Sequence, residues 1–126
     1  TGNGDPISDV ERPVAVWQVP REVLAPVTMA AADRIRIITT IGDSMEPSIP
    51  AGSKLMVDTS DCMPSPPGIF VVFDGIGLVV KRVEYVPHSE PARVRLWSDN
   101  PAYESYERPL TDANIRGRVI GRWRWM

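Results

Sequence analysis

The sequence predicts a mostly β domain with short helical turns. Thirteen prolines and nine glycines among 126 residues interrupt the chain too often for a helical bundle. Between these interruptions lie short runs of β-branched and aromatic residues, which are typical of strands. The length fits one hydrophobic core, so we expect a single domain.

The expected domain spans residues 14–126, preceded by a polar linker or cleavage-region arm over residues 1–13. Because the chain begins abruptly at Thr1 without methionine, we expect it to be part of a longer protein. Each expected strand is an apolar or alternating run between turn formers. In order, the strands are 14–17, 34–40, 54–58, 69–73, 78–86, 93–97 and 115–126.

The connections between these strands are predicted from proline, glycine and Asx residues. One helical turn is expected at 21–24, because Pro20 favours a helix start. The clearest hairpin turn is 74–77, where Asp74-Gly75 readily takes the positive φ angles of a tight turn. The other connections are a turn-rich break at 42–52, a loop at 59–68, a polar loop at 98–108 and a turn at 111–114.

Charge and composition exclude several classes of protein. A net charge of −2 lacks the basic excess of a nucleic-acid-binding domain, so any DNA reading is expected elsewhere in the protein. No apolar run approaches the roughly 20 residues that span a bilayer, so we expect a cytoplasmic protein without membrane contact. We expect neither a metal nor a cofactor. The late arginines favour a solvated face over a phosphate track: Arg95, Arg108, Arg116, Arg118, Arg122 and Arg124.

Two potentially reactive side chains are poor candidates for catalysis. Cys62 is the only cysteine, which excludes an internal disulfide and fits a reducing cytosol. Its neighbours Asp58 and Asp61 should raise the pKa of the thiol, which favours a plain loop cysteine over a nucleophile. His88 is a lone histidine in a loop, which disfavours a Ser-His-Asp triad.

The candidate nucleophile is Ser44. It follows a predicted strand in the segment Gly42-Asp43-Ser44-Met45-Glu46-Pro47, where a serine at a strand end can project into a cleft. Backbone N–H groups of such a turn can face a developing oxyanion. Serine alone is a weak nucleophile, so it needs a base nearby.

Lys81 is the candidate base. On its strand it shares one face with Val79 and Val83, while Arg82 points the other way, toward water. An apolar face destabilises an ammonium and so favours the neutral amine that a base requires. The same pattern also fits an edge lysine that discourages aggregation, or one that snorkels out of the core. The strand alone leaves these alternatives open.

Four segments carry a resemblance to a known family: IGDSMEPSI at 41–49, AGSKLMVD at 51–58, LVVKRV at 78–83, and LWSDNPAY at 96–103 followed by 115–122. Together they resemble the C-terminal domains of LexA-like and phage-type repressors. This self-cleaving serine–lysine peptidase family also contains the mutagenesis protein UmuD. The order and spacing of the segments match the family over roughly residues 10–126.

The resemblance implies a β fold shared with type I signal peptidases. It implies that Ser44 is the nucleophile and Lys81 the general base of a catalytic dyad. Asp43 and Met45 are then expected in the binding cleft and oxyanion region, with core packing as the alternative for Met45. Residues 98–100 are expected to form a turn rather than to act in catalysis.

The resemblance also implies the C-terminal regulatory domain of a transcriptional repressor that cuts its own linker. Such a repressor binds operator DNA through an N-terminal helix-turn-helix, and a RecA-type recombinase filament is the implied trigger of cleavage. However, the only Ala-Gly pair, Ala51-Gly52, follows Ser44 instead of preceding it, and no Cys-Gly pair occurs. A non-cleaving dimerisation domain with a vestigial dyad therefore stays open, as do a UmuD-like accessory protein and a type I signal peptidase.

We also expect a homodimer whose contact includes residues 115–126. Trp123 and Trp125 are alternate residues of the last strand and are expected on the same face as Gly121. An apolar stripe on a terminal strand marks either a core face or an interface. Gly117 and Gly121 are expected bulge or bend points. A two-fold dimer matches the symmetry of a palindromic operator.

Overall fold

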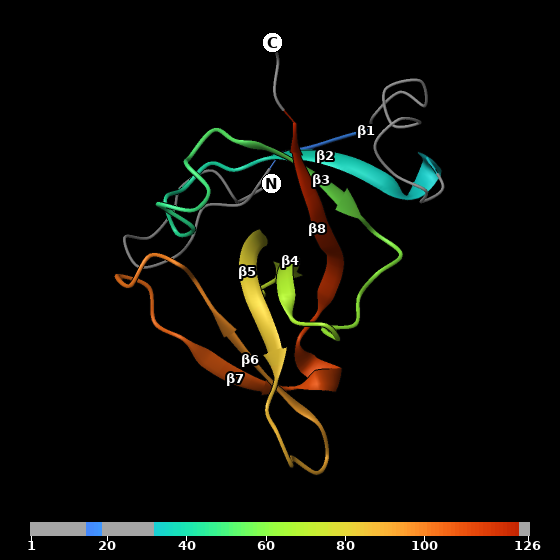
Figure 1. The fold of residues 1–126 in the computed structure, drawn as a ribbon, viewed down its shortest axis with the longest axis vertical. Helices are drawn as coiled ribbons and strands as arrows, with labels where there is room; N and C mark the ends of the chain where they lie inside the picture. The colour runs from blue at the N-terminus through green and yellow to red at the C-terminus, as the bar shows by residue number, and fades with distance from the viewer. Residues whose placement is uncertain (1–14, 19–31, 124–126) are drawn as a thin grey trace.

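Eight strands form one antiparallel sheet in the part of the chain that the computed structural model describes, residues 15–18 and 32–123 (Figure 1). The order of the strands across the sheet is β1-β2-β3-β8-β4-β5-β6-β7. Two short 3-10 helices, η1 (Ala32–Arg34) and η2 (Leu110–Asp112), accompany the strands. The strands are β1 (Ala15–Gln18), β2 (Ile35–Thr39), β3 (Lys54–Asp58), β4 (Gly68–Phe73), β5 (Leu78–Tyr85), β6 (Arg93–Trp97), β7 (Tyr106–Pro109) and β8 (Ile115–Trp123). The prediction of a mostly β fold with short helical turns is confirmed.

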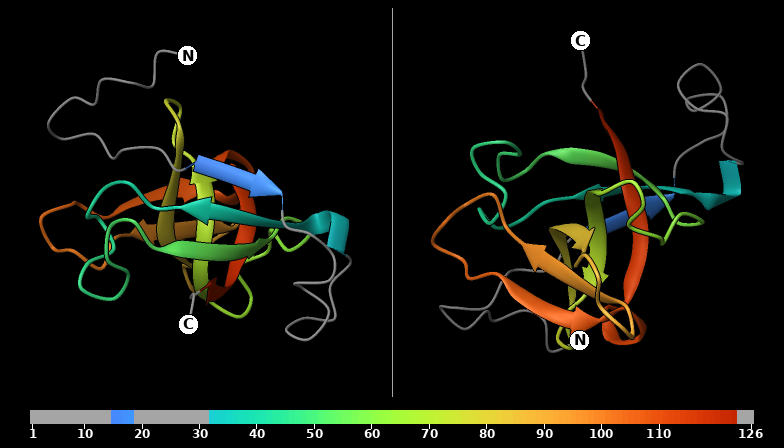
Figure 2. Two further views of the ribbon diagram at one scale, coloured as in Figure 1. Left: turned by 90° about the horizontal axis from the view of Figure 1, so that it is seen from above. Right: turned by 60° about the horizontal axis from the view of Figure 1, so that its bottom comes forward.

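Strand β8 joins two halves of the sheet. Its second part pairs with β3 and its first part pairs with β4, so it runs through both halves in Figure 1. Figure 2 shows β1, β2 and β3 running across β4 and β5 rather than along them. The pairing shifts register twice, leaving Arg116 as an extra residue beside Gly117 and Ile120 as one beside Gly121. The predicted bulge points at both glycines are therefore confirmed.

The bulge at Ile120 changes the expected apolar stripe. Val119 and Gly121 lie opposite the consecutive residues Val57 and Met56, so the simple alternation along β8 is broken there. Val119 packs against the hydrophobic core. The apolar stripe that was predicted from alternate residues of this strand is thus interrupted. Trp125, which was expected to belong to it, lies outside the described residues.

Two hydrophobic clusters fill the interior, one on each side of the β4–β5 hairpin. The hairpin is therefore buried on both faces, which explains its nearly continuous run of apolar residues. The first cluster lies between the two halves of the sheet and comprises Ile38, Met45, Ile49, Leu55, Val57, Val71 and Val80. The second cluster comprises Phe70, Val72, Val79, Val83, Val94, Leu96 and Ala113.

The hairpin turn between β4 and β5 lies where the sequence predicts it. The N–H of Asp74 donates to the carbonyl of Gly77 at 3.1 Å. Only Gly75 of the Asp-Gly pair has a positive φ, 97°. Asp74 contributes differently, since its carboxylate accepts from the N–H groups of Ile76 and Gly77 at 2.8 and 2.9 Å.

The sequence prediction misses β7. Residues 98–108 were expected to form a polar loop, but Tyr106–Pro109 pairs with β6 at the edge of the sheet. Its Glu107 and Arg108 are exposed, so β7 lacks the apolar alternation by which strands are recognised. The expected helical turn at 21–24 and the arm at 1–13 lie outside the described residues. No helix in the described ranges has the length and apolarity needed to cross a membrane.

Candidate active site

Ser44 lies in a compact turn that follows β2. Within this turn the N–H of Glu46 donates to the carbonyl of Asp43 at 3.1 Å, and the N–H of Ile49 donates to the carbonyl of Met45 at 2.8 Å. The side chains of Met45 and Ile49 belong to the first cluster and anchor the turn in the core. Ser44 itself is buried, with 8% of its surface exposed. Hydrophobic packing therefore determines where the serine lies.

Met45 packs in the interior, in agreement with the core-packing alternative for this residue. Only 2% of its surface is exposed, and it does not line the pocket described below. Asp43 lines that pocket together with Lys81, whereas Ser44 is not among the lining residues.

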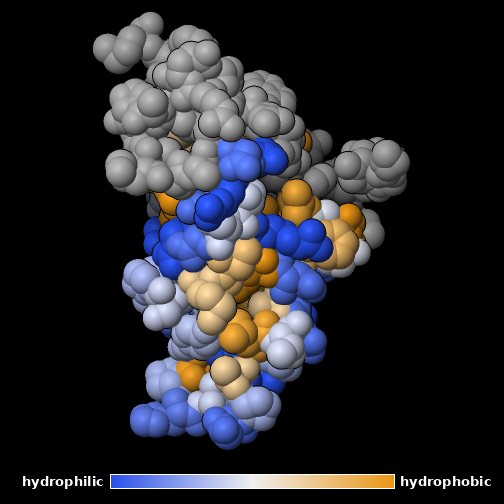
Figure 3. All heavy atoms as spheres, turned by 90° about the vertical axis from the view of Figure 1, so that its right-hand side faces the viewer, coloured by the Kyte–Doolittle hydropathy of each residue, from blue (hydrophilic) through white to orange (hydrophobic). Residues whose placement is uncertain are grey.

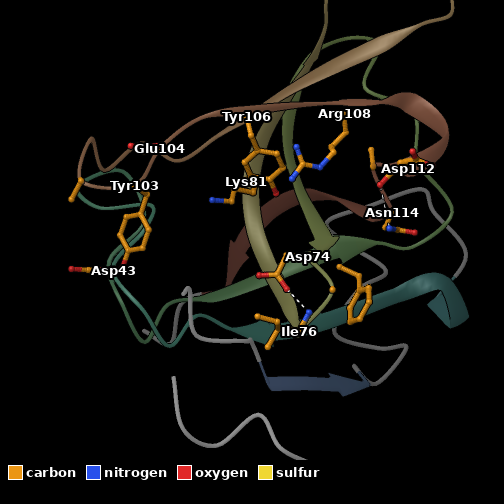
Figure 4. A pocket seen from close by; sticks show the side chains of 14 residues that line it. Asp43, Asp74, Ile76, Lys81, Tyr103, Glu104, Tyr106, Arg108, Asp112 and Asn114 are labelled. Carbon is orange, nitrogen blue, oxygen red and sulfur yellow. Dashed lines mark hydrogen bonds between the residues drawn. The ribbon is translucent and has the colours of Figure 1, made fainter. Parts of the chain in front are cut away.

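Lys81 is buried on the apolar face that the sequence predicts. Val79 and Val83 flank it on β5, and only 5% of the lysine is exposed. Its Nζ donates to Ser98 Oγ at 2.9 Å. The rings of Tyr103 and Tyr106 lie with their centroids 6.0 and 5.7 Å from Nζ (Figure 4). The lysine is therefore neither an exposed edge residue nor a snorkelling one.

One segment, residues 98–103, contacts both candidates. Ser98 accepts the hydrogen bond from Lys81. The N–H of Asn100 donates to the carbonyl of Ser44 at 2.9 Å, and its Nδ2 donates to the carbonyl of Asp43 at 3.0 Å. Tyr103 Oη donates to Asp43 Oδ1 at 2.6 Å. The segment thus connects the backbone of the serine turn with the amine of the lysine.

The predicted turn in this segment is present, but turn formation is not its only role. Asn100 Oδ1 accepts from the N–H of Ala102 at 3.0 Å, as an Asx turn requires. Ser98 contacts the buried lysine, which the sequence prediction missed. A signal was available, because Ser98 continues the inward parity of Val94 and Leu96 on β6 and is itself 6% exposed.

Asp99 forms an ion pair with Arg82, the neighbour of Lys81. Arg82 Nη2 donates to Asp99 Oδ2 at 3.0 Å, and Arg82 Nε contacts Oδ1. These hydrogen bonds from Arg82 hold the pKa of Asp99 below its usual range, although partial burial of the carboxylate acts in the opposite direction. Arg82 was expected to point toward water, and it does so only in part, since its side chain is 37% exposed.

An open pocket of about 910 Å³ lies beside Lys81 (Figure 4). Four carboxylates and two basic side chains line it, so acidic groups outnumber basic ones. Its lining comes from the serine turn, the β4–β5 turn, β5, and the chain from residue 102 to residue 114: Asp43, Phe73, Asp74, Gly75, Ile76, Lys81, Ala102, Tyr103, Glu104, Tyr106, Arg108, Asp112, Ala113 and Asn114.

Cys62 and His88, which the sequence analysis judged poor candidates for catalysis, do not line this pocket. Burial raises the pKa of the Cys62 thiol, and the charges of Asp61 and Asp58 raise it further, in the direction predicted. Its Sγ donates to the carbonyl of Thr59 within the loop. His88 is exposed, with a positive φ of 59° in the loop between β5 and β6.

The late arginines make local contacts within the fold. The guanidinium carbons of four of them lie over aromatic rings: Arg95 over Trp97, Arg108 over Tyr106, Arg116 over Phe73 and Arg118 over Phe70. Arg118 pairs with Asp61 at 2.7 Å, and Arg122 donates to the carbonyl of Ser48 at 2.7 Å. Four of the arginines are exposed, as a solvated face predicts, but the side chain of Arg118 is only 16% exposed. Arg124 lies outside the described residues.

Comparison with known proteins identifies a family. A family model described as Peptidase S24-like matches residues 3–120, nearly the whole chain. The match includes most of the arm that precedes the expected domain. None of the curated proteins matches the chain.

Proposed function

Because the chain belongs to the Peptidase S24-like family, we propose that it is the C-terminal regulatory domain of a transcriptional repressor that cuts its own linker. Ser44 is the nucleophile of this proposal and Lys81 its base. The observation that carries the proposal is the shared segment 98–103. It holds the serine turn through Asn100 and the buried amine through Ser98.

The proposed chemistry uses the hydroxyl of Ser44 and the amine of Lys81. A neutral Lys81 amine accepts the proton of Ser44 as the hydroxyl oxygen attacks the carbonyl carbon of the linker peptide bond. The resulting ammonium returns the proton to the leaving amine, and the C–N bond breaks to leave an acyl-enzyme. Water then hydrolyses the ester with the lysine again as base. Lys81 lies buried beside Val79 and Val83 on β5 and donates to Ser98.

Regulation follows if the domain also pairs two protomers. We propose that an N-terminal helix-turn-helix binds operator DNA, and that a homodimer of this domain supplies the two-fold symmetry. Cleavage then separates the DNA-binding domain from the dimerisation domain and ends repression. A recombinase filament is the proposed trigger.

The test of the dyad uses the protein extended by its natural N-terminal linker. Ser44→Ala and Lys81→Ala should each slow self-cleavage by at least about 10³-fold, because nucleophile and base act as a unit. Matched controls are Ser60→Ala, in an exposed loop, and Lys54→Ala, the only other lysine. Cleavage is followed by gel electrophoresis, and thermal unfolding verifies that each variant is folded.

Two results would contradict the proposed peptidase activity. Cleavage that persists in Ser44→Ala would assign the reaction to another group. An extended wild-type protein that does not cleave itself even with an activated recombinase filament would favour the non-cleaving dimerisation domain instead.

The dimer is tested separately by sedimentation of the 126-residue chain. Apolar residues gather in the middle of the face in Figure 3, bordered by hydrophilic ones. Ile120 on β8 is 39% exposed, and Trp123 ends the same strand. Ile120→Ala and Trp123→Ala should weaken the dimer about tenfold or more, whereas Ile76→Ala, at the hairpin tip, should not. A wild type that stays monomeric at high micromolar concentration contradicts the prediction.

A further inference from the structure

Tyr103 contacts both sides of the proposed dyad. Its Oη donates to Asp43 Oδ1 at 2.6 Å, and Asp43 directly precedes Ser44 in the chain. Its ring lies beside the Lys81 amine, with the ring centroid 6.0 Å from Nζ. Figure 4 shows Tyr103 between Asp43 and Lys81, and all three residues line the pocket. One aromatic side chain therefore reaches from the serine turn to the buried lysine.

Further hydrogen bonds attach the segment that carries Tyr103 to the same turn. Asn100 donates through its N–H to the carbonyl of Ser44 at 2.9 Å, and through Nδ2 to the carbonyl of Asp43 at 3.0 Å. The N–H of Tyr103 donates in turn to the carbonyl of Asn100 at 3.1 Å. Residues 100–103 thus hold Asp43 at both its backbone and its side chain.

The contact between Tyr103 and Asp43 has the geometry of a strong hydrogen bond. Its length of 2.6 Å is typical of a hydroxyl that donates to a carboxylate, and such bonds are roughly twice as strong as those between neutral groups. The tyrosine side chain is also rigid, because it has only two torsion angles. The Asp43 side chain is therefore tied to a rigid ring that lies beside Lys81.

We propose that Tyr103 is a positioning residue, which fixes the distance between the serine turn and the Lys81 amine by bonding to Asp43. This role rests on the peptidase activity proposed above. The phenol acts through Asp43 and takes no part in the proton transfer. A direct contact between the phenol and the substrate is the alternative, because Tyr103 lines the pocket. The two roles differ in whether the effect of the hydroxyl requires Asp43.

The first experiment measures self-cleavage of the protein extended by its natural N-terminal linker. A misplacement of about 1 Å can slow a reaction about 100-fold. Because the bonds from Asn100 remain, Tyr103→Phe should cause a smaller loss, about tenfold. Asp43→Ala should cause a similar loss, and Asp43→Asn, which keeps an oxygen acceptor, should recover to within about threefold of wild type. Tyr85→Phe, at a tyrosine that does not line the pocket, is the matched control and should cleave at the wild-type rate.

The double variant Asp43→Ala with Tyr103→Phe decides between the two roles. If the hydroxyl acts through Asp43, the double variant should be slowed about tenfold, like each single variant, and not about 100-fold. Losses that multiply would assign the hydroxyl to the substrate and overturn the positioning role. A wild-type rate in Tyr103→Phe, an equal loss in Tyr85→Phe, or no recovery in Asp43→Asn would overturn it as well. Thermal unfolding verifies that each variant is folded.

The second experiment does not depend on cleavage. In the extended protein carrying Ser44→Ala, amide hydrogen exchange of Glu46, whose N–H donates to the carbonyl of Asp43, reports the order of the serine turn. Tyr103→Phe should accelerate this exchange at least about threefold and leave that of Thr59, which is bonded outside the turn, unchanged. Faster exchange at Glu46, in a protein whose wild type never cleaves, would support the ordering of the turn by Tyr103 while refuting the proposed peptidase activity. Unchanged exchange overturns the positioning role whether or not the wild type cleaves.

Discussion

The two sides of the β4–β5 hairpin hold the two halves of the proposed dyad in different ways. On the side of the first cluster, Met45 and Ile49 bring the serine turn into an apolar core. On the side of the second cluster, Lys81 lies in the same row as Val79 and Val83 and is held by a hydrogen bond to Ser98. The serine is thus placed by hydrophobic packing, while the lysine is placed by a polar partner within apolar surroundings.

This difference separates two requirements of a serine–lysine site. A nucleophile needs a defined position, which close packing provides. A lysine base also needs the neutral form, which desolvation favours. Arg82, the neighbour of Lys81 on β5, differs from it in both respects. It faces away from the second cluster, and it is paired with Asp99. One strand therefore offers a buried amine on one face and a paired guanidinium on the other.

The largest expected effect compares the two clusters directly. Phe70 is completely buried in the second cluster, and Ile49 is 6% exposed at the edge of the first. Phe70→Ala should lower the free energy of unfolding by about 3–5 kcal/mol, and Ile49→Ala by about 2 kcal/mol. Urea unfolding of both variants measures this. A larger loss for Ile49→Ala would show that the serine turn, rather than the hairpin, is the better-packed region.

A smaller effect is expected at the two glycines of β8, which joins the halves of the sheet. A Cβ at Gly117 would lie 2.7 Å from Val57 Cγ1 and 2.9 Å from the carbonyl oxygen of Asp58, so the backbone must shift. At Gly121 the nearest atom is the flexible end of Met56, at 3.2 Å. Gly117→Ala should therefore cost about 1–3 kcal/mol of unfolding free energy and Gly121→Ala less than about 1 kcal/mol. Equal losses in chemical unfolding would contradict the close approach at Gly117.

The smallest expected effect is the pH dependence of the Asp99–Arg82 pair. The pKa of Asp99 is lowered in the folded protein, chiefly by hydrogen bonds from Arg82. Its contribution to stability is therefore present above the unfolded pKa of about 3.9, and is lost as pH falls through the lower folded value. Wild type should be more stable than Asp99→Asn at pH 7, and the difference should shrink toward pH 2. Thermal unfolding across that range measures it, and a constant difference would contradict the lowered pKa.

Most strands could be predicted from the sequence because their apolar residues follow local patterns. Residues 54–58 were predicted with the bounds of β3, and the β4–β5 hairpin follows from β-branched runs on either side of Asp74-Gly75. Strand β7 could not be predicted in this way. Its residues are largely exposed, and pairing with β6 rather than an apolar face makes it a strand.

The sequence by itself determined the fold class, the buried row on β5 and the turn after β2, since periodicity and turn chemistry are local properties. Only the tertiary structure decided which groups meet across the chain. The hydrogen bond between Lys81 and Ser98 joins residues that are 17 positions apart in the sequence, and the one between Asn100 and Asp43 joins residues that are 57 positions apart. Such contacts depend on how β6 returns beside β5 and how the serine turn packs on the first cluster. A polar segment such as 98–103 has no periodicity from which its distant partners could be inferred, so its role becomes visible only when the sheet is assembled.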